Sequence, residues 1–136
     1  MKDKRITLNR AVKCYKPCRI REGDERYKDS MEFFKKYGFH YEEVWSLDGE
    51  AAYFILTRLV QLRKVGCGCP GSFARGTERS EWDASDADFK RWETQLDKMI
   101  RGFYLYCTID FPDAKEQKII DKALKLFAEH FHGLWD

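Results

Sequence analysis

The sequence lacks any long hydrophobic run. No segment approaches the roughly 18 consecutive apolar residues that a membrane-spanning helix requires, and no apolar stretch follows the charged residues 1–10 as it does in an export signal. We therefore expect a cytoplasmic protein with no membrane contact. The 136 residues, 43% hydrophobic and 15% aromatic, are typical of one globular domain.

The glycine-rich loops that hold nucleotide phosphates are also missing, since neither G-x-x-x-x-G-K-[ST] nor G-x-G-x-x-G occurs. The nearest approach, residues 66–71, follows a predicted helix rather than a strand. The chain has three histidines, and two of them, His130 and His132, fall at a predicted helix end, where an imidazole suits the helix dipole. We find no catalytic constellation and predict that the protein is not an enzyme.

The five cysteines are an odd number, and without an export signal they are more typical of reduced thiols than of disulfides. Cys14, Cys18, Cys67 and Cys69 offer four thiolates to one tetrahedral zinc ion, although structural zinc sites more often place two residues within each pair. The alternative is that they are ordinary thiols, with Cys107 a core residue. Zinc is the one cofactor that the sequence suggests.

Helical spacing dominates after residue 27. A short helix is expected to begin at Asp29 or Ser30 and to end before Gly38, because glycine readily adopts the left-handed conformation. Three longer helices follow, over 47–65, from Ser80 or Asp86 up to 111–112, and from 112 or 113 to 132. Their apolar stripes predict a mainly α fold, a bundle of three long helices plus one short helix.

The basic N-terminal segment, residues 1–27, is ambiguous. Short alternating runs around Pro17 indicate a small β-ribbon, but Ile6, Leu8, Ala11 and Val12 also fit helical spacing. We expect a single domain, 1–136, in which this segment joins a helical bundle over 28–136.

Charge is unevenly distributed along the chain. Residues 1–36 hold 12 basic and 6 acidic side chains, whereas residues 37–136 hold 13 and 17. The basic set, with Tyr15 among it, suits the phosphates of a nucleic acid, although no recognition motif accompanies it and a solvated face is the simpler interpretation. Within the helix over 47–65, Arg58 falls near the inward sector, where we expect an ion pair with Asp48 or Asp97, or an acidic ligand.

Four motifs in fixed order carry a resemblance: Trp45-Ser46-Leu47-Asp48, the run over 54–59, the run over 96–100 and the ending over 126–135. Over residues 45–136 the chain resembles a family of small uncharacterised proteins encoded by bacteriophages and prophages. The resemblance implies a helical fold, an origin in a phage-infected host cell and no particular activity. Family members have a proline before the arginine matched by Arg58, and a proline there kinks the helix. This chain has Thr57 at that position, so the resemblance does not carry the kink over.

These features favour a non-enzymatic phage accessory protein that binds a host or viral macromolecule, in a counter-defence or regulatory role. The expected partner-binding residues are Trp45, Arg58, Arg63, Arg5, Arg10, Lys13, Arg19 and Arg21. One alternative is a zinc-stabilised nucleic-acid-binding module, and another is a protein that sequesters a small nucleotide in a crevice lined by Arg58 and Arg63. A homo-oligomer is a further alternative, because the side chains of Trp82, Trp92 and Trp135 present more apolar surface than one small core can bury.

Overall fold

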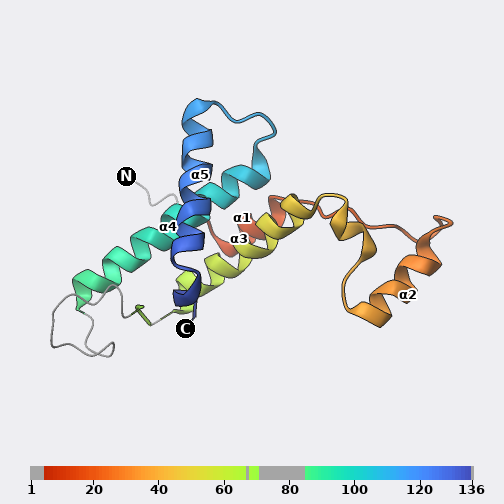
Figure 1. The fold of residues 1–136 in the computed structure, drawn as a ribbon, viewed down its shortest axis with the longest axis horizontal. Helices are drawn as coiled ribbons and strands as arrows, with labels where there is room; N and C mark the ends of the chain where they lie inside the picture. Colours follow the sequence, from red (N-terminus) through yellow and green to blue (C-terminus); the bar gives the residue numbers. More distant parts are fainter. Residues whose placement is uncertain (1–4, 67, 71–84, 136) are drawn as a thin grey trace.

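The fold, in a computed structural model that describes residues 5–66, 68–70 and 85–135, is all-α, and no strand occurs in these ranges. The elements are α1 (Leu8–Lys13), α2 (Tyr27–Tyr37), η1 (Tyr41–Val44), α3 (Leu47–Val65), α4 (Asp86–Thr108), α5 (Ala114–Glu129) and η3 (Phe131–Gly133), where η denotes a 3-10 helix. Figure 1 shows α3, α4 and α5 packed together, with α2 projecting from one end of α3. The predicted fold class is confirmed. No helix in the described part of the chain is long and apolar enough to cross a membrane.

The core lies where α4 packs against both α3 and α5. Trp92, Leu96, Met99 and Phe103 of α4 are all buried, as the spacing of three and four residues predicts. Leu56 of α3 faces them and is completely inaccessible to solvent. This apolar seam explains why α3, α4 and α5 pack together.

The helices end where local chemistry stops them. Gly38 follows α2 with φ of 79°, and its N–H donates to the carbonyl of Phe34 at 2.8 Å. Asp113 begins α5 by accepting from the N–H of Glu116 at 2.7 Å, and the Glu116 carboxylate accepts from the N–H of Asp113. The last helix stops at Glu129, earlier than predicted, and a 3-10 turn completes the chain. The alternative start at Ser80 lies outside the described residues, whereas α4 begins after Ser85.

In the N-terminal segment, the predicted helical alternative is confirmed by α1, and the predicted β-ribbon is wrong for the described residues 5–27. Thr7 caps α1 by accepting from the N–H of Arg10 at 3.3 Å. Ala11 then packs with no exposed surface against the bundle, because α1 lies along α3. Ala11 therefore belongs to the core, and Ile6, Leu8 and Cys14 pack against it partly buried.

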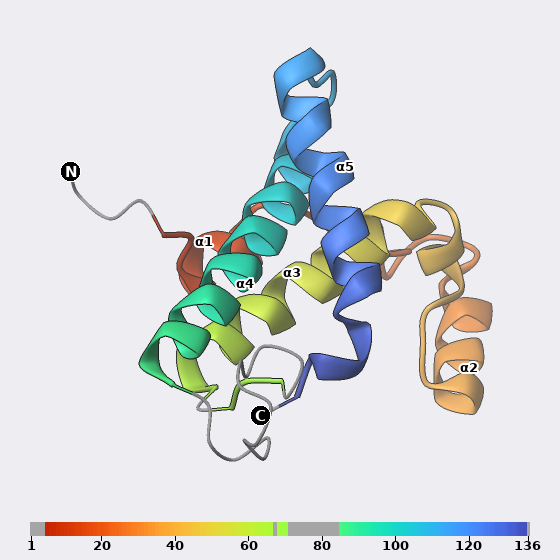
Figure 2. The same ribbon diagram turned by 60° about the vertical axis from the view of Figure 1, so that its left-hand side comes forward.

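Residues 20–46 form an arm that carries α2 away from the bundle. Both views show α2 separated from α4 and α5 (Figures 1 and 2). Within the arm α2 packs on η1, and η1 in turn contacts α3. The amphipathic pattern of α2 is thus satisfied locally rather than by the bundle.

Candidate partner-binding site

The arm presents a group of aromatic rings that touch one another. Phe33 of α2 lies at its centre, with ring centroids 4.7 Å from Tyr37, 5.3 Å from Phe39 and 5.8 Å from Tyr41. Tyr41 in turn meets Trp45 edge to face at 6.0 Å. We call these five residues the aromatic cluster. Ring pairs at such separations are favourable beyond the area that they bury.

The aromatic cluster is only half covered. Tyr37, Tyr41 and Trp45 expose 54%, 49% and 45% of their surface. The guanidinium of Arg26 lies over the Trp45 ring at 5.5 Å, which leaves a cation at the margin of the exposed aromatic face. Trp45 was among the predicted partner-binding residues, and the structure places it beside four other rings that the sequence analysis did not select.

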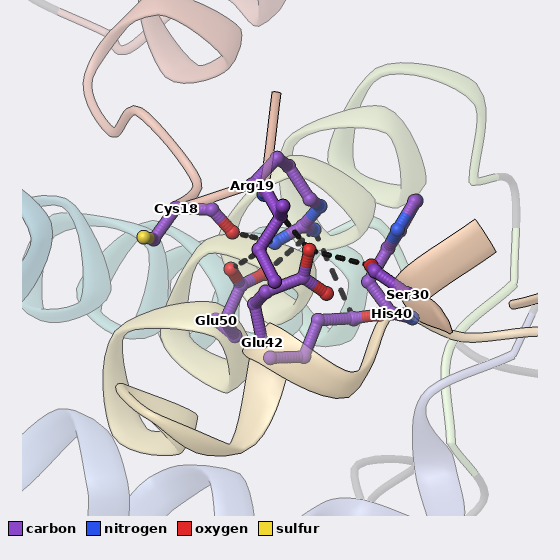
Figure 3. A network of polar contacts seen from close by, with 8 residues as sticks. Cys18, Arg19, Ser30, His40, Glu42 and Glu50 are labelled. Atoms are coloured by element: carbon purple, nitrogen blue, oxygen red, sulfur yellow. Dashed lines mark hydrogen bonds and ion pairs between the residues drawn. The ribbon is translucent and has the colours of Figure 1, made fainter. Parts of the chain in front are cut away.

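A buried carboxylate fixes the arm. Glu42 of η1 is 1% exposed, and its Oε1 atom accepts from the N–H of Ile20 at 2.8 Å and from Ser30 Oγ at 2.7 Å (Figure 3). Glu42 thereby ties together three segments: η1, α2 and the extended chain that precedes α2. Its Oε2 atom has no hydrogen-bond partner in the described part of the chain.

The charge state of Glu42 follows from these contacts. Burial by itself raises the pKa of the carboxyl, because it disfavours the charged form. Backbone hydrogen bonds, Ser30 and the nearby His40 outweigh burial, so the pKa lies below its ordinary value. Glu42 is therefore ionised at neutral pH, and it acts as a fixed anion that holds the arm together.

Arg19 provides the second attachment of the arm. Its guanidinium donates to both oxygens of Glu50 in the first turn of α3, at 2.6 and 3.2 Å, and Glu50 is 8% exposed (Figure 3). A third contact reaches the carbonyl of Cys18 at 2.7 Å. The hydrogen bonds with Glu50 raise the pKa of Arg19 further. Arg19, one of the predicted partner-binding residues, therefore has a structural contact of its own within the fold.

The predicted binding residues do not converge on one place. Arg10 donates to the hydroxyl of Tyr104 at 3.1 Å and lies over its ring, so it joins α1 to α4. Arg5 lines a cleft of about 300 Å³ together with Arg63. Lys13 and Arg21 are exposed. The basic segment is thus spread over the bundle and the arm rather than gathered into one patch.

Arg58 corrects the sequence analysis. It is exposed, donates to Thr57 Oγ1 at 2.9 Å and lies over the Phe54 ring at 4.0 Å. The expected ion pair belongs to Arg63, which binds Asp97 at 3.0 Å and Glu93 at 3.3 Å. Apolar residues cover more than half of α3, so periodicity alone does not define its inward face.

The cysteines do not form a zinc site within the described residues. No three metal-binding side chains group together there, so Cys14, Cys18 and Cys69 do not form one cluster, while Cys67 falls outside the described residues. Cys14 instead shares a thiol hydrogen bond with Cys107 of α4. Burial is the main cause that raises the pKa of Cys107 to about 12, so this thiol is protonated at neutral pH.

Two further surface features were missed in the sequence. An apolar groove of about 370 Å³ runs between α3, α4 and α5, and Asp48 at its margin accepts a hydrogen bond from Tyr106. A second hollow, between α4 and α5, is lined almost entirely by cations. The spacing of Lys115, Lys118 and Lys122 on one helical face was the signal for the second hollow.

Comparison of the chain with known protein families, with curated proteins and with solved structures found no match. The resemblance to phage-encoded proteins therefore stays a prediction.

Proposed function

We propose that the protein is a non-enzymatic accessory module that binds another protein through the aromatic cluster of its arm. The half-exposed state of Tyr37, Tyr41 and Trp45 is the observation that carries the proposal. Contiguous exposed apolar surface marks interaction sites on soluble proteins. Tryptophan, tyrosine and arginine are also the residues that contribute most to protein interfaces.

The rigidity of the arm supports the same function. The buried contacts of Glu42 and the bidentate pair of Arg19 with Glu50 hold the rings in place before any partner arrives. A surface that is already ordered loses less conformational entropy on binding. This is the behaviour of a docking surface rather than of a loosely folded extension.

The charge of the arm indicates what kind of partner it accepts. Residues 20–46 carry five basic and seven acidic side chains, and one of the acidic residues, Glu42, is buried, so the surface of the arm has little net charge. A strongly charged partner would gain little from it, whereas an apolar protein surface with pockets for aromatic rings fits it well. In the context of the phage resemblance, that partner is a host or viral protein.

Affinity capture from host lysate tests the proposal, with Trp45→Ala as the variant and Phe111→Ala as the control. Phe111 is 94% exposed and lies in the loop that connects α4 to α5, so its removal takes away an exposed ring without changing the arm. Truncation of a central aromatic residue costs about 2 kcal/mol or more, which corresponds to roughly 30-fold in Kd. A partner retained by wild type and Phe111→Ala but lost by Trp45→Ala supports the proposal.

Two further measurements sharpen the test. The Kd of the complex should change little when the salt concentration is raised about fivefold, from about 0.1 to about 0.5 M, because apolar contacts are not screened. Light scattering of the purified protein shows whether the partner is a second copy: a dimer that Trp45→Ala converts to a monomer identifies it. Equal capture by wild type and Trp45→Ala, with both variants folded by circular dichroism, would refute the function.

The alternative functions receive less support from the geometry. A nucleotide site lined by Arg58 and Arg63 has less support, because Arg58 lies over Phe54 at the surface while Arg63 pairs with Asp97 and Glu93. A zinc-stabilised module would depend on Cys67, which lies outside the described residues. Elemental analysis of the purified protein tests for the roughly one zinc ion per chain that this alternative requires.

A further inference from the structure

A furrow between α4 and α5 gathers positive charge from two helices. Lys98 and Arg101 of α4 line one side, and Lys115, Lys118 and Lys122 of α5 line the other, around a hollow of about 340 Å³. Ile119 is the remaining lining residue. We call these five basic residues the cationic furrow. It lies outside the basic N-terminal segment, where Arg10, Arg19 and Arg26 are engaged in contacts within the fold.

The charges of the cationic furrow are not neutralised by the protein. None of the five forms an ion pair within 4.0 Å with a carboxylate of the described residues. Lys118 and Lys122 stand four residues apart on α5, and Lys98 and Arg101 stand three apart on α4, so neighbouring charges repel within each helix. Close approach of α4 to α5 at Gly102 and Ala123 adds repulsion between the helices. A bound polyanion would relieve that repulsion.

The cationic furrow continues across α4, on the side away from α5. Arg101 also lines the neighbouring cleft, where Arg5 and Arg63 contribute two more guanidinium groups. Asp97 lies in that cleft and is bound by Arg63, so it removes part of the charge there. The result is a basic path across α4, strongest at the cationic furrow and weaker toward α1.

The lining also limits the kind of anion. Among the described residues, no aromatic side chain lines the furrow, and Ile119 is the one apolar residue there. Proteins that bind single strands stack bases on aromatic rings, whereas contacts to duplexes fall mostly on the phosphate backbone. From the five unpaired cations and the missing aromatic platform, we propose that the cationic furrow binds the phosphate backbone of a double-stranded nucleic acid, without sequence preference. This site is separate from the aromatic cluster, because α2 lies beyond one end of α3, away from α4 and α5 (Figure 2).

Fluorescence anisotropy with labelled duplexes of about 20 base pairs tests the proposal, since such a length exceeds the span of one bundle helix. The probes are two unrelated DNA sequences, one RNA duplex and one single strand. The furrow variant combines Lys118→Glu with Lys122→Glu. The control combines Lys28→Glu with Lys35→Glu, two exposed positions on α2, and therefore makes the same change in net charge on the arm.

We expect wild type and control to bind both DNA sequences equally and the furrow variant to bind at least about tenfold more weakly. The plot of log K against log salt has a negative slope, and loss of two phosphate contacts makes that slope shallower by about 1.8. The furrow variant should melt at the same temperature as wild type or higher, because the repulsion is relieved, so weaker binding does not reflect misfolding. Comparison of the DNA and RNA duplexes shows which nucleic acid supplies the phosphates.

Four results would overturn the proposal. They are wild-type binding that is absent at low salt, equal binding by the furrow variant, an equal loss in the control, and tighter binding of the single strand than of the duplex. Capture of the protein partner through Trp45 is measured separately, so failure of the cationic furrow leaves the function of the aromatic cluster open to its own test.

Discussion

Gly102 of α4 sits where α4 and α5 come closest, and adding one methyl group there tests the packing of the bundle. A Cβ atom at Gly102 would lie 2.1 Å from the Cβ of Ala123 and 2.9 Å from the carbonyl oxygen of Ile119. Both atoms are fixed to the α5 backbone and have no rotamer that moves them away. In Gly102→Ala the two helices must therefore separate.

The magnitude follows from two opposing effects. Carbon atoms at rest lie about 3.5–4.0 Å apart, so α5 has to move by roughly 1.5 Å at this point. Overpacking of this kind costs about 3 kcal/mol, at the upper end of its usual range. Replacing a glycine inside a helix by alanine returns about 1 kcal/mol, because alanine loses less backbone entropy. The net expectation is a loss of about 2 kcal/mol in the free energy of unfolding.

Chemical denaturation with thermal melting measures the loss, which corresponds to a fall of roughly 6–10 °C in Tm for a chain of this size. Gly49→Ala in the first turn of α3 is the matched control. Its Cβ would meet only the ring of Tyr15, at 2.9 to 3.1 Å, and that side chain can rotate aside. A Gly102→Ala protein that melts at or above the wild-type temperature would refute the close packing of α4 on α5.

Three other predictions concern the arm and the thiols. Glu42→Ala leaves the donors of Ile20 and Ser30 unpaired, so we expect the arm to lose about 2–4 kcal/mol, seen as faster hydrogen exchange in α2 with α4 unchanged; equal exchange in both proteins would contradict this. Because the pKa of Glu42 is lowered from 4.5, its stabilisation is present above that pH and is lost as the pH falls through the lowered pKa. Amide exchange itself slows in acid, so the quantity to compare is the protection factor of α2, which should fall toward about pH 3 in the wild type and stay constant in Glu42→Ala. Brief alkylation followed by peptide mass spectrometry should modify exposed Cys18 before Cys107, whose pKa is about 12, and the reverse order would contradict the burial of Cys107.

Most helix boundaries could be predicted because they depend on neighbours in the sequence. Gly38 and Gly66 follow α2 and α3, and Asp113 caps α5, each through contacts within four residues. The buried seam of α4 was equally readable, because Trp92 and Phe103 belong to one pattern of spacing. Local chemistry of this kind leaves its signature in adjacent letters of the sequence.

The arm could not be predicted in the same way. The apolar face of α2 indicates that the helix is covered, but it does not say by what, and the cover is η1, a short 3-10 turn with no periodic signal. The prediction that Arg58 lies near the inward side of α3 was wrong for a related reason. On a helix as apolar as α3, the sector that faces outward is decided by where α1 and α4 pack.

The residues of the candidate sites could be selected from the sequence only in part. Trp45 was selected from the sequence, but its association with Phe33 and Tyr37 depends on the return of the chain through η1. Lys118 and Lys122 share a readable face of α5, whereas their approach to Arg101 depends on the crossing of two helices. Residues that are distant in sequence meet only through the fold.

The arm leaves the bundle and returns to it at the same helix, since α1 packs along α3 and η1 leads directly into α3. Such a closed excursion can change length at little thermodynamic cost, because doubling a loop adds only about 0.6 kcal/mol of closure entropy. Insertions near Gly38, at the end of α2, should therefore be tolerated while the bundle folds unchanged. The arm is in this sense an exchangeable part, whose length and sequence can change while the bundle that carries it stays the same.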